Sequence, residues 1–309
     1  MRILVVGAGA IGGYFGGRLL ESGRDVTFLV RPRRSEQLAR TGLSIRSPRG
    51  DADLPAPTVQ AGALREPYDL ILLSCKAYDL PEAMLSFAPA VGADTAILPL
   101  LNGMRHLDLL TERFGDHAVL GGQCLISATL DGDGRILHLS DAHSLSFGER
   151  DGAATGRSHA IASVLTGAGF DARRSDTILQ DMWDKWVFIA AAAGITCLMR
   201  SSVGDIVAAG AADLASALLD ECAAIAASQG FPPDATVLQR SRTLLTAAGS
   251  GLTASMLRDV EHNARTEVDH VLGDLLRRGE GPAGVPTLLR IAYAHLCAYE
   301  VRRGRPRAA

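Results

Sequence analysis

Apolar residues recur along the chain with two different periods. In the first half, short runs rich in Val, Ile and Leu predict buried strands, and apolar residues three or four positions apart between them predict helices. The expected strands are residues 2–6, 25–30, 69–74, 95–98 and 118–120. Strands that alternate with helices indicate a parallel, doubly wound sheet.

The stretch from residue 123 to residue 148 has a different pattern. Two segments of alternating residues flank the sequence DGDG at 131–134, which is typical of a β-hairpin turn. We expect antiparallel strands here that complete the edge of the sheet. One more helix–strand unit is expected at 158–173.

From about residue 176 the apolar positions follow a helical period only. The expected helices are residues 177–199, 213–228, 236–245, 258–277 and 286–302. The sequence therefore predicts an α/β domain over residues 1–175 and an all-α C-terminal domain over residues 176–309.

The first strand is followed by a glycine-rich turn of sequence GAGAIG at residues 7–12. Gly7 allows the tight turn, Gly9 lets a pyrophosphate approach the backbone, and Gly12 lets helix and strand pack closely. Ala10 and Ile11 open the helix, whose N-terminal N–H groups attract an anion. The motif predicts a Rossmann-type domain that binds a dinucleotide at these positions. The alternative is a tight strand–helix turn without a ligand.

The end of the second strand indicates which dinucleotide is bound. An acidic residue there would bind the ribose 2′-hydroxyl of NAD, but this chain has Arg31, followed by Arg33 and Arg34. A guanidinium fork suits a 2′-phosphate, so we expect NADP(H) with Arg31 as its ligand. The alternative is a solvated basic loop.

Composition narrows the function classes. The chain has 309 residues, 47% hydrophobic and 21% charged, which excludes disorder of the whole chain and suggests two domains. With 31 basic and 34 acidic residues, the chain has no overall positive charge that would attract nucleic acid or an anionic membrane. Five scattered cysteines without a CxxC pair predict reduced thiols in the cytoplasm. The apolar run 186–199 is shorter than the roughly 20 residues of a membrane span.

Further sequence pieces carry a family resemblance. They are GAGAIGGYFGGRL at 7–19, Arg31, SCKAYD at 74–79, LNG at 101–103, DKW at 184–186 and SMLRDVEHNARTEVD at 255–269. In order and spacing the chain resembles the ketopantoate reductases (2-dehydropantoate 2-reductases). The resemblance implies a Rossmann domain, a helical domain and an active site in the cleft between them. It also implies NADPH-dependent reduction of a small 2-oxo acid, which in pantothenate biosynthesis is ketopantoate.

The resemblance also assigns roles to individual residues. It implies that Lys185 is the general acid, that Asn102 lies near nicotinamide and substrate, and that Glu267, on a helix, binds substrate and positions the lysine. Lys76 is implied near cofactor and substrate, and Ser255 at the substrate carboxylate. Read from the residues alone, Asn102 is equally a turn asparagine, Lys185 a lysine that snorkels to solvent, and Lys76 and Glu267 exposed charges.

Several positions depart from the family pattern. Two family asparagines that hold the hydroxyl and carboxylate end of ketopantoate are replaced here by Ile189 and Ala193. A third family asparagine is replaced by Leu252, and a fourth, in an NGE-like stretch, lies in VGD at 203–205. Apolar replacements remove discrimination that rests on a substrate hydroxyl. We therefore expect a more apolar 2-oxo acid or ketone as substrate.

Other functions stay open at this point. One alternative is an NADP-dependent dehydrogenase that oxidises a different hydroxy acid or an amine-derived substrate. Another is a non-catalytic NADPH-binding protein, and a third, an S-adenosylmethionine-dependent methyltransferase, is disfavoured by the glycine motif and Arg31. The eight histidines form no HExxH motif and are interpreted as surface or core residues, so no metal is expected. We expect a homodimer through the alanine- and leucine-rich helices 213–228 and 286–302.

Overall fold

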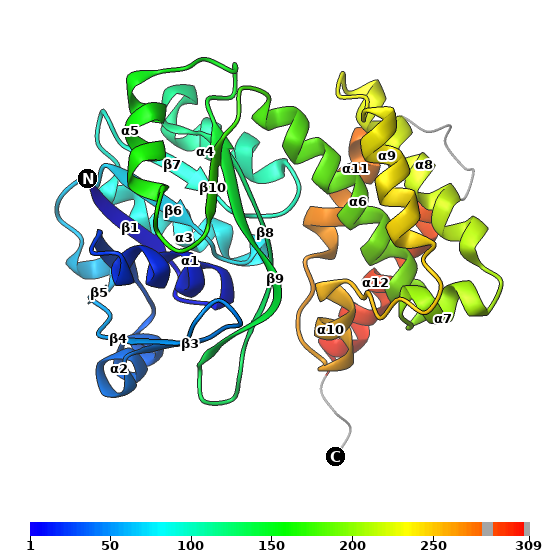
Figure 1. The fold of residues 1–309 in the computed structure, drawn as a ribbon, viewed down its shortest axis with the longest axis horizontal. Coiled ribbons are helices and arrows are strands. Elements are labelled where there is room, and N and C mark those ends of the chain that lie inside the picture. The colour runs from blue at the N-terminus through cyan, green and yellow to red at the C-terminus, as the bar shows by residue number, and fades with distance from the viewer. Residues whose placement is uncertain (280–286, 306–309) are drawn as a thin grey trace. The chain divides into compact units, whose positions relative to one another are not determined.

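The computed structural model describes residues 1–279 and 287–305 (Figure 1). The chain forms two compact units. The first is Met1–Leu101 with His106–Leu179, and the second is Asn102–Arg105 with Gln180–Ala309. The chain passes from the first unit to the second after Leu179, four residues after the expected boundary at 175. The short segment Asn102–Arg105 also belongs to the second unit, although the residues on both sides of it belong to the first.

A parallel sheet forms the centre of the first unit. Its strands are β1 (Arg2–Val6), β2 (Asp25–Leu29), β5 (Thr58–Val59), β6 (Leu70–Leu73) and β7 (Ala96–Pro99). They are arranged in the order β5-β2-β1-β6-β7, and every neighbouring pair is parallel. This order confirms the predicted doubly wound sheet and places β1 at its centre.

The predicted hairpin forms with the expected antiparallel pairing, but it does not lie at the edge of the parallel sheet. β8 (Gly121–Leu130) and β9 (Ile136–Gly148) are antiparallel, as the DGDG turn predicts. They do not extend the parallel sheet, because β9 pairs with other strands in a second sheet. That sheet also contains β3 (Leu43–Arg46), β4 (Ala52–Leu54) and β10 (Asp171–Arg174), in the order β10-β9-β3-β4.

The expected strand at 118–120 is wrong. Only Val119 bridges to the parallel sheet, through Ile97. A 3₁₀ turn, η4 (Asp116–Ala118), occupies the residues before it, and the chain then enters β8.

The helices of the first unit lie on or beside these two sheets (Figure 1). They are α1 (Ala10–Glu21), α2 (Pro32–Thr41), α3 (Leu80–Phe87), α4 (Arg105–Phe114) and α5 (Gly156–Leu165), with short 3₁₀ turns η1 (Ala61–Ala63), η2 (Ala77–Asp79) and η3 (Ala88–Ala90). The α5–β10 pair confirms the helix–strand unit expected at 158–173.

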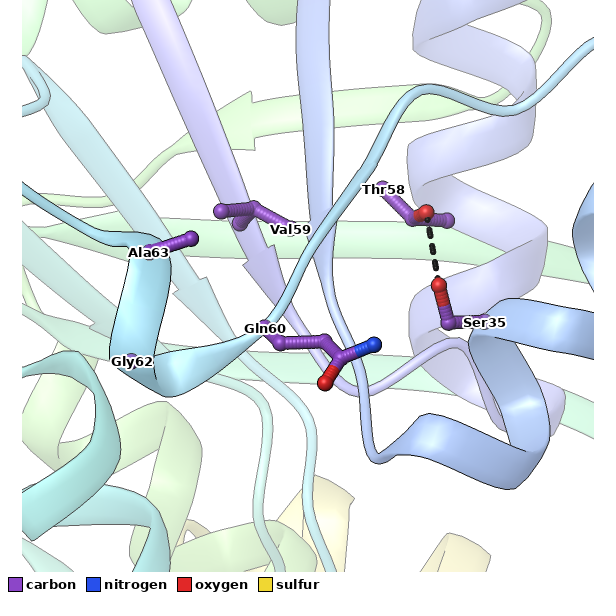
Figure 2. Close-up of a pocket in the computed structure, with 6 residues that line it drawn as sticks. All are labelled: Ser35, Thr58, Val59, Gln60, Gly62 and Ala63. Carbon is purple, nitrogen blue, oxygen red and sulfur yellow. Dashed lines mark hydrogen bonds between the residues drawn. The ribbon is translucent and has the colours of Figure 1, made fainter.

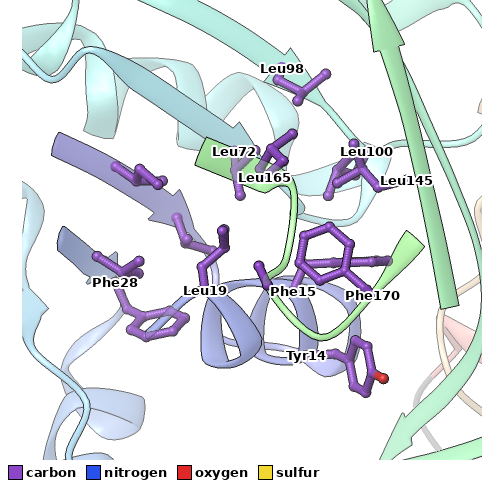
Figure 3. Close-up of a cluster of buried hydrophobic side chains, with 14 of the residues drawn as sticks. Tyr14, Phe15, Leu19, Phe28, Leu72, Leu98, Leu100, Leu145, Leu165 and Phe170 are labelled. Atoms are coloured by element: carbon purple, nitrogen blue, oxygen red, sulfur yellow. The ribbon is translucent and has the colours of Figure 1, made fainter. Parts of the chain in front are cut away.

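Helix α1 packs between the two sheets. A Cβ on Gly16 would lie 2.7 Å from the Phe28 ring, and one on Gly17 would lie 2.7 Å from Ile45 of the second sheet. The small residues therefore let the helix approach both sheets closely. Tyr14 and Phe15 fill the space beside them, within the buried cluster that Figure 3 shows.

The described residues of the second unit are helical, as predicted. The helices are α6 (Ile178–Met199), α7 (Val203–Ala208), α8 (Ala212–Ser228), α9 (Ala235–Leu245), α10 (Ser255–Glu261), the π-helical turn η5 (Asp269–Gly273), α11 (Asp274–Arg278) and α12 (Leu288–Arg303). By length and composition alone α6 could cross a membrane, but 67% of its apolar window is buried, as in the core helix of a globular domain. The first residue of the helix expected at 286–302 lies outside the described residues.

The single helix expected at 258–277 is wrong. The chain leaves α10 at Glu261, and Asn263 has a positive φ of 53°. Contacts with α12 replace the helical hydrogen bonds: the Tyr299 hydroxyl donates to the Ala264 carbonyl at 2.7 Å, and the Thr266 N–H donates to Glu300 at 2.6 Å. These distant partners explain why the local periodicity predicted an uninterrupted helix.

Candidate active site

The glycine loop, residues 7–12, joins β1 to α1 in the first unit. Gly7 has a φ of 95°, which a residue with a side chain rarely adopts. A Cβ on Gly12 would lie 2.0 Å from Ser74 Oγ and 2.2 Å from the Gly7 carbonyl oxygen. Ser74, which follows β6, donates its hydroxyl to the carbonyls of Val6 (3.0 Å) and Gly7 (3.2 Å). Ser74, just after the neighbouring strand β6, therefore packs against the loop and leaves no room for a side chain at Gly12.

The outer side of the glycine loop is open. Apart from Gly9 itself and its two chain neighbours, no described residue has a heavy atom within 4 Å of the position that a Cβ on Gly9 would take. Gly9 is also the N-cap of α1, and no side chain of the described residues caps this helix. Free N–H groups and the positive end of the helix dipole meet an open space here, so the loop fits the pyrophosphate of a dinucleotide.

Arg31 lies at the carboxyl edge of the parallel sheet, as the sequence predicts, and is the N-cap of α2. Its Nη2 binds two carboxylates, Asp79 Oδ1 at 3.1 Å and Glu82 Oε2 at 2.6 Å. These hydrogen bonds raise the pKa of the guanidinium above its ordinary value. The sequence showed the arginine but not its two acidic partners.

A second arginine of the same segment contacts the glycine loop. Arg34 Nε donates to the Ala8 carbonyl at 3.1 Å, and its Nη1 donates to the Gly134 carbonyl at 3.0 Å and to Gln37 at 2.7 Å. Arg34 therefore joins the loop to the β8–β9 turn. This role was not predicted. Lys76 is exposed and precedes η2, at the same edge of the sheet.

The first unit also has a pocket of about 400 Å³ beside its edge strand β5 (Figure 2). It is lined by Ser35, Thr58, Val59, Gln60, Gly62 and Ala63. The hydroxyls of Ser35 and Thr58 lie 3.1 Å apart and bond to each other. None of these residues was predicted to have a functional role.

In the second unit, the structure brings two of the predicted residues into direct contact. Lys185 on α6 is half-buried, and its Nζ donates to Asn102 Oδ1 at 2.9 Å. Trp183 and Trp186, on either side of it in the sequence, are 2% and 0% exposed. The ammonium is therefore held by an amide oxygen at a fixed place on a rigid helix.

His270 supports this pair from the other side of Asn102. It is 7% exposed, and its ring is hydrogen-bonded to the backbone of Asn102. Gly103, with a φ of 77°, packs directly against it: a Cβ there would lie 3.0 Å from the His270 carbonyl oxygen. Burial lowers the pKa of His270, although the charges of Glu267 and Asp274 oppose this shift. From the sequence, His270 is interpreted, like the other histidines, as a surface or core residue.

Glu267 is not on a helix, contrary to the expectation. It lies just before η5, and its carbonyl accepts the N–H groups of His270 (3.0 Å) and Val271 (2.9 Å). The Trp186 indole donates to the Val271 carbonyl at 2.9 Å, which ties this turn to α6 next to Lys185. We call Asn102, Lys185, Glu267 and His270 the lysine region.

Ser255 is exposed and begins α10. The N–H of Ala254, just before it, donates to Thr196 Oγ1 on α6 at 3.4 Å. Thr196 lies eleven residues after Lys185, or about 16 Å along a helix axis. The structure thus places Ser255 beside a later part of α6.

Two of the positions that depart from the family pattern are buried or take part in a helix cap. Ala193, two turns after Lys185, is only 4% exposed. Asp205 forms a capping box with Ser202 at the start of α7: the Asp205 N–H donates to Ser202 Oγ at 3.3 Å, and the Ser202 N–H donates to Asp205 Oδ2 at 3.3 Å. Within residues 1–279 and 287–305, no group of three or more His, Cys, Asp or Glu side chains could hold a metal ion.

Two family models match the chain. The model described as ketopantoate reductase PanE/ApbA matches residues 3–152, and the one described as ketopantoate reductase PanE/ApbA C terminal matches residues 177–298.

Individual proteins agree with these models. The uncharacterized oxidoreductase YkpB of Bacillus subtilis is 38% identical over 304 residues, covering 98% of this chain and 100% of the relative. The 2-dehydropantoate 2-reductase of Archaeoglobus fulgidus is 30% identical over 280 residues, covering 90% of this chain and 91% of the relative. Among solved structures, D-mandelate dehydrogenase in a ternary structure with NADH and anilino(oxo)acetate shares the fold, with a TM-score of 0.87 at 22% identity over 99% of this chain and 100% of that chain. The chain belongs to the ketopantoate reductase family of oxidoreductases.

Proposed function

We propose that the protein is an NADP(H)-dependent reductase of a small 2-oxo acid. The observation that carries the proposal is the 2.9 Å hydrogen bond between Lys185 Nζ and Asn102 Oδ1. When bound at the glycine loop, the dinucleotide supplies the hydride that reduces the substrate carbonyl. The remaining chemistry is the transfer of one proton to the carbonyl oxygen.

Lys185 is the proton donor in this proposal. Asn102 accepts one N–H of the ammonium and so directs the others toward a substrate oxygen. The half-buried position strengthens the electrostatic attraction between the ammonium and the negative charge that develops on that oxygen. As the hydride reaches carbon, Lys185 gives its proton to oxygen, a hydroxyl forms, and the lysine is later reprotonated from solvent.

The other predicted residues bind and orient. Glu267 holds the substrate and helps to position the lysine. The role of Ser255 at the substrate carboxylate is proposed from the family resemblance alone, since Ser255 lies beside Thr196, about three turns of α6 after Lys185. Gly7, Gly9, Ala10, Ile11 and Gly12 bind the pyrophosphate, Arg31 binds the 2′-phosphate, and Lys76 contacts both cofactor and substrate.

The substrate in this proposal is more apolar than ketopantoate. Ile189 and Ala193 follow Lys185 by one and two turns of α6, and neither side chain bonds a hydroxyl. A fold shared with D-mandelate dehydrogenase, whose substrate is a 2-hydroxy acid with a phenyl ring, supports a 2-oxo acid with a bulky apolar group. It also favours a second candidate function, the oxidation of such a hydroxy acid.

We further propose that the enzyme acts in the cytoplasm as a homodimer. Its five cysteines all lie in the described part of the chain and are free thiols, which suits a reducing compartment.

A substrate screen tests the proposed function. NADPH oxidation is followed with straight-chain, branched and aryl 2-oxo acids and with ketopantoate, and NADP⁺ reduction is followed with the matching 2-hydroxy acids. We expect the highest kcat/KM on an apolar 2-oxo acid. Higher kcat/KM on ketopantoate would overturn the substrate assignment, and faster oxidation than reduction would favour the second function. Cofactor binding without any turnover would indicate a non-catalytic protein.

A further inference from the structure

Three charged residues form a bridge across the carboxyl edge of the parallel sheet. Arg31 follows β2, and Asp79 and Glu82 follow β6. In the sheet order, β1 lies between β2 and β6, and the glycine loop begins where β1 ends. The ion pairs therefore connect the two sides of the loop on which a dinucleotide would lie.

Two carboxylates bond the same nitrogen of the Arg31 guanidinium. Arg31 Nη2 lies 3.1 Å from Asp79 Oδ1 and 2.6 Å from Glu82 Oε2. Asp79 is the N-cap of α3 and Glu82 is in its first turn, where a helix stabilises negative charge. Both carboxylates thus lie beside the arginine at the start of α3.

We propose that Asp79 and Glu82 determine the choice between NADPH and NADH by weakening the preference that Arg31 gives for the 2′-phosphate. This inference rests on the proposed function, in which Arg31 is the phosphate ligand. Both carboxylates bond Nη2, so a 2′-phosphate that binds any nitrogen of this guanidinium would lie close to two negative charges. The 2′-hydroxyl of NADH is uncharged, and a carboxylate is its usual hydrogen-bond acceptor. The protein is therefore expected to prefer NADPH over NADH by no more than about tenfold.

The neighbouring arginine does not replace Arg31. The Nε and Nη1 of Arg34 bind the carbonyls of Ala8 and Gly134, and its Nη2 is buried from solvent. A phosphate at this edge would have to displace contacts that hold the glycine loop. The carboxylates beside Arg31 thus decide how strongly a 2′-phosphate is bound.

Affinity measurements on charge-removal variants test the proposal. The dissociation constants of NADPH and NADH are measured by fluorescence for the wild type, Asp79→Asn, Glu82→Gln and the double variant, at low and high salt. At about 5 Å in water, each carboxylate removed should raise the preference for NADPH roughly three- to fivefold, and the double variant should raise it roughly ten- to twenty-fivefold, with smaller effects at high salt. The wild type should bind NADH within about tenfold of NADPH.

Two controls separate the possible failures. Glu36 is exposed on α2, so Glu36→Gln removes one charge from the same region without touching Arg31 and should leave the ratio unchanged. Arg31→Ala tests the proposed function itself. If Arg31→Ala leaves NADPH affinity intact, the assignment of Arg31 fails. If it weakens NADPH binding while the double variant keeps the wild-type ratio, only the role of Asp79 and Glu82 is refuted. Glu82 is 65% exposed, so Glu82→Gln is expected to fold. This single variant still tests the proposal if the double variant fails to fold.

Discussion

The glycine loop and the lysine region are built in opposite ways. The loop consists of consecutive backbone, and its neighbours leave no room for one more carbon at Gly12. The lysine region consists of side chains from three distant segments, joined by single hydrogen bonds such as that between Lys185 and Asn102. The loop should therefore fail when an atom is added, and the lysine region when a hydrogen-bonding group is removed.

The largest effect is expected from Gly12→Ala. Its Cβ would lie 2.0 Å from Ser74 Oγ and 2.2 Å from the Gly7 carbonyl oxygen, so the loop must move away from β6. We expect at least about 3 kcal/mol of lost stability and roughly a hundredfold weaker cofactor binding. Thermal unfolding and cofactor titration measure both effects.

Gly9→Ala is the matched control for this substitution. The described residues leave the space around a Cβ on Gly9 empty, so the variant should melt close to the wild type and lose cofactor affinity only. Normal cofactor binding by Gly12→Ala, or a loss of stability in Gly9→Ala equal to that in Gly12→Ala, would contradict this account of the glycine loop.

Removal of the His270 ring should weaken catalysis in the second unit. Without its hydrogen bond, the Asn102 backbone is less firmly held, and Lys185 loses its fixed orientation. A buried hydrogen bond is worth about 1–3 kcal/mol, so His270→Ala should lower kcat about tenfold or more, with little change in cofactor affinity. The pH profile of kcat should shift as well, because the environment of the lysine changes.

Val271→Ala controls for loss of packing in the same turn. Val271 is 3% exposed, and only its backbone carbonyl bonds Trp186. The control should be destabilised but keep its kcat. An equal fall of kcat in both variants would mean that His270 acts through packing alone.

A smaller effect is expected from Glu300, which holds the chain just before Glu267. Its Oε1 accepts both the N–H (2.6 Å) and the hydroxyl (2.7 Å) of Thr266. Glu300→Ala should lower kcat/KM roughly fivefold, whereas Glu300→Gln, which keeps an acceptor oxygen, should recover part of it. The exposed ion pair of Asp220 with Arg242 offers a control, since Asp220→Ala should leave kcat/KM unchanged. No recovery in Glu300→Gln would contradict the positioning role.

The smallest expected effect is a pH dependence of stability. In the first unit, His143 is buried and bonded to the Tyr14 hydroxyl at 2.8 Å, and its pKa is lowered by burial and by Arg49. The pKa of His270 in the second unit is also lowered, by burial. The unfolded chain then binds more protons than the folded one, so the unfolding free energy should fall as the pH drops below about 6.5.

Urea unfolding between about pH 7.5 and 5.5 measures this slope above the range in which the carboxylates titrate. His143→Gln should flatten it partly. A stability that is constant or rises on acidification would show that neither histidine is protonated less readily in the folded state.

The two regions also differ in how far the sequence predicts them. The strand, the glycines and the first helix of the loop are adjacent, so their pattern alone predicts the structure. The acidic partners of Arg31 and the Ser74 neighbour of Gly12 lie 48 to 62 positions away and were missed.

In the second unit, the break before Glu267 depends on Tyr299 and Glu300, and the support of Asn102 depends on His270. The hydrophobic periodicity of a single segment cannot predict these contacts, because they join residues far apart in the sequence. The resemblance supplied the candidate residues, but the structure was needed to show which of them touch.

The most direct test of the proposed chemistry is the steady-state rate of Lys185→Ala on the best 2-oxo acid found by screening. Lys185, on α6, is not among the residues proposed to bind the cofactor, so the cofactor dissociation constant should stay within about twofold of the wild type. We predict that kcat falls at least ~10²-fold because the proton donor is lost. A kcat within about threefold of the wild type would contradict the role of Lys185 as the general acid.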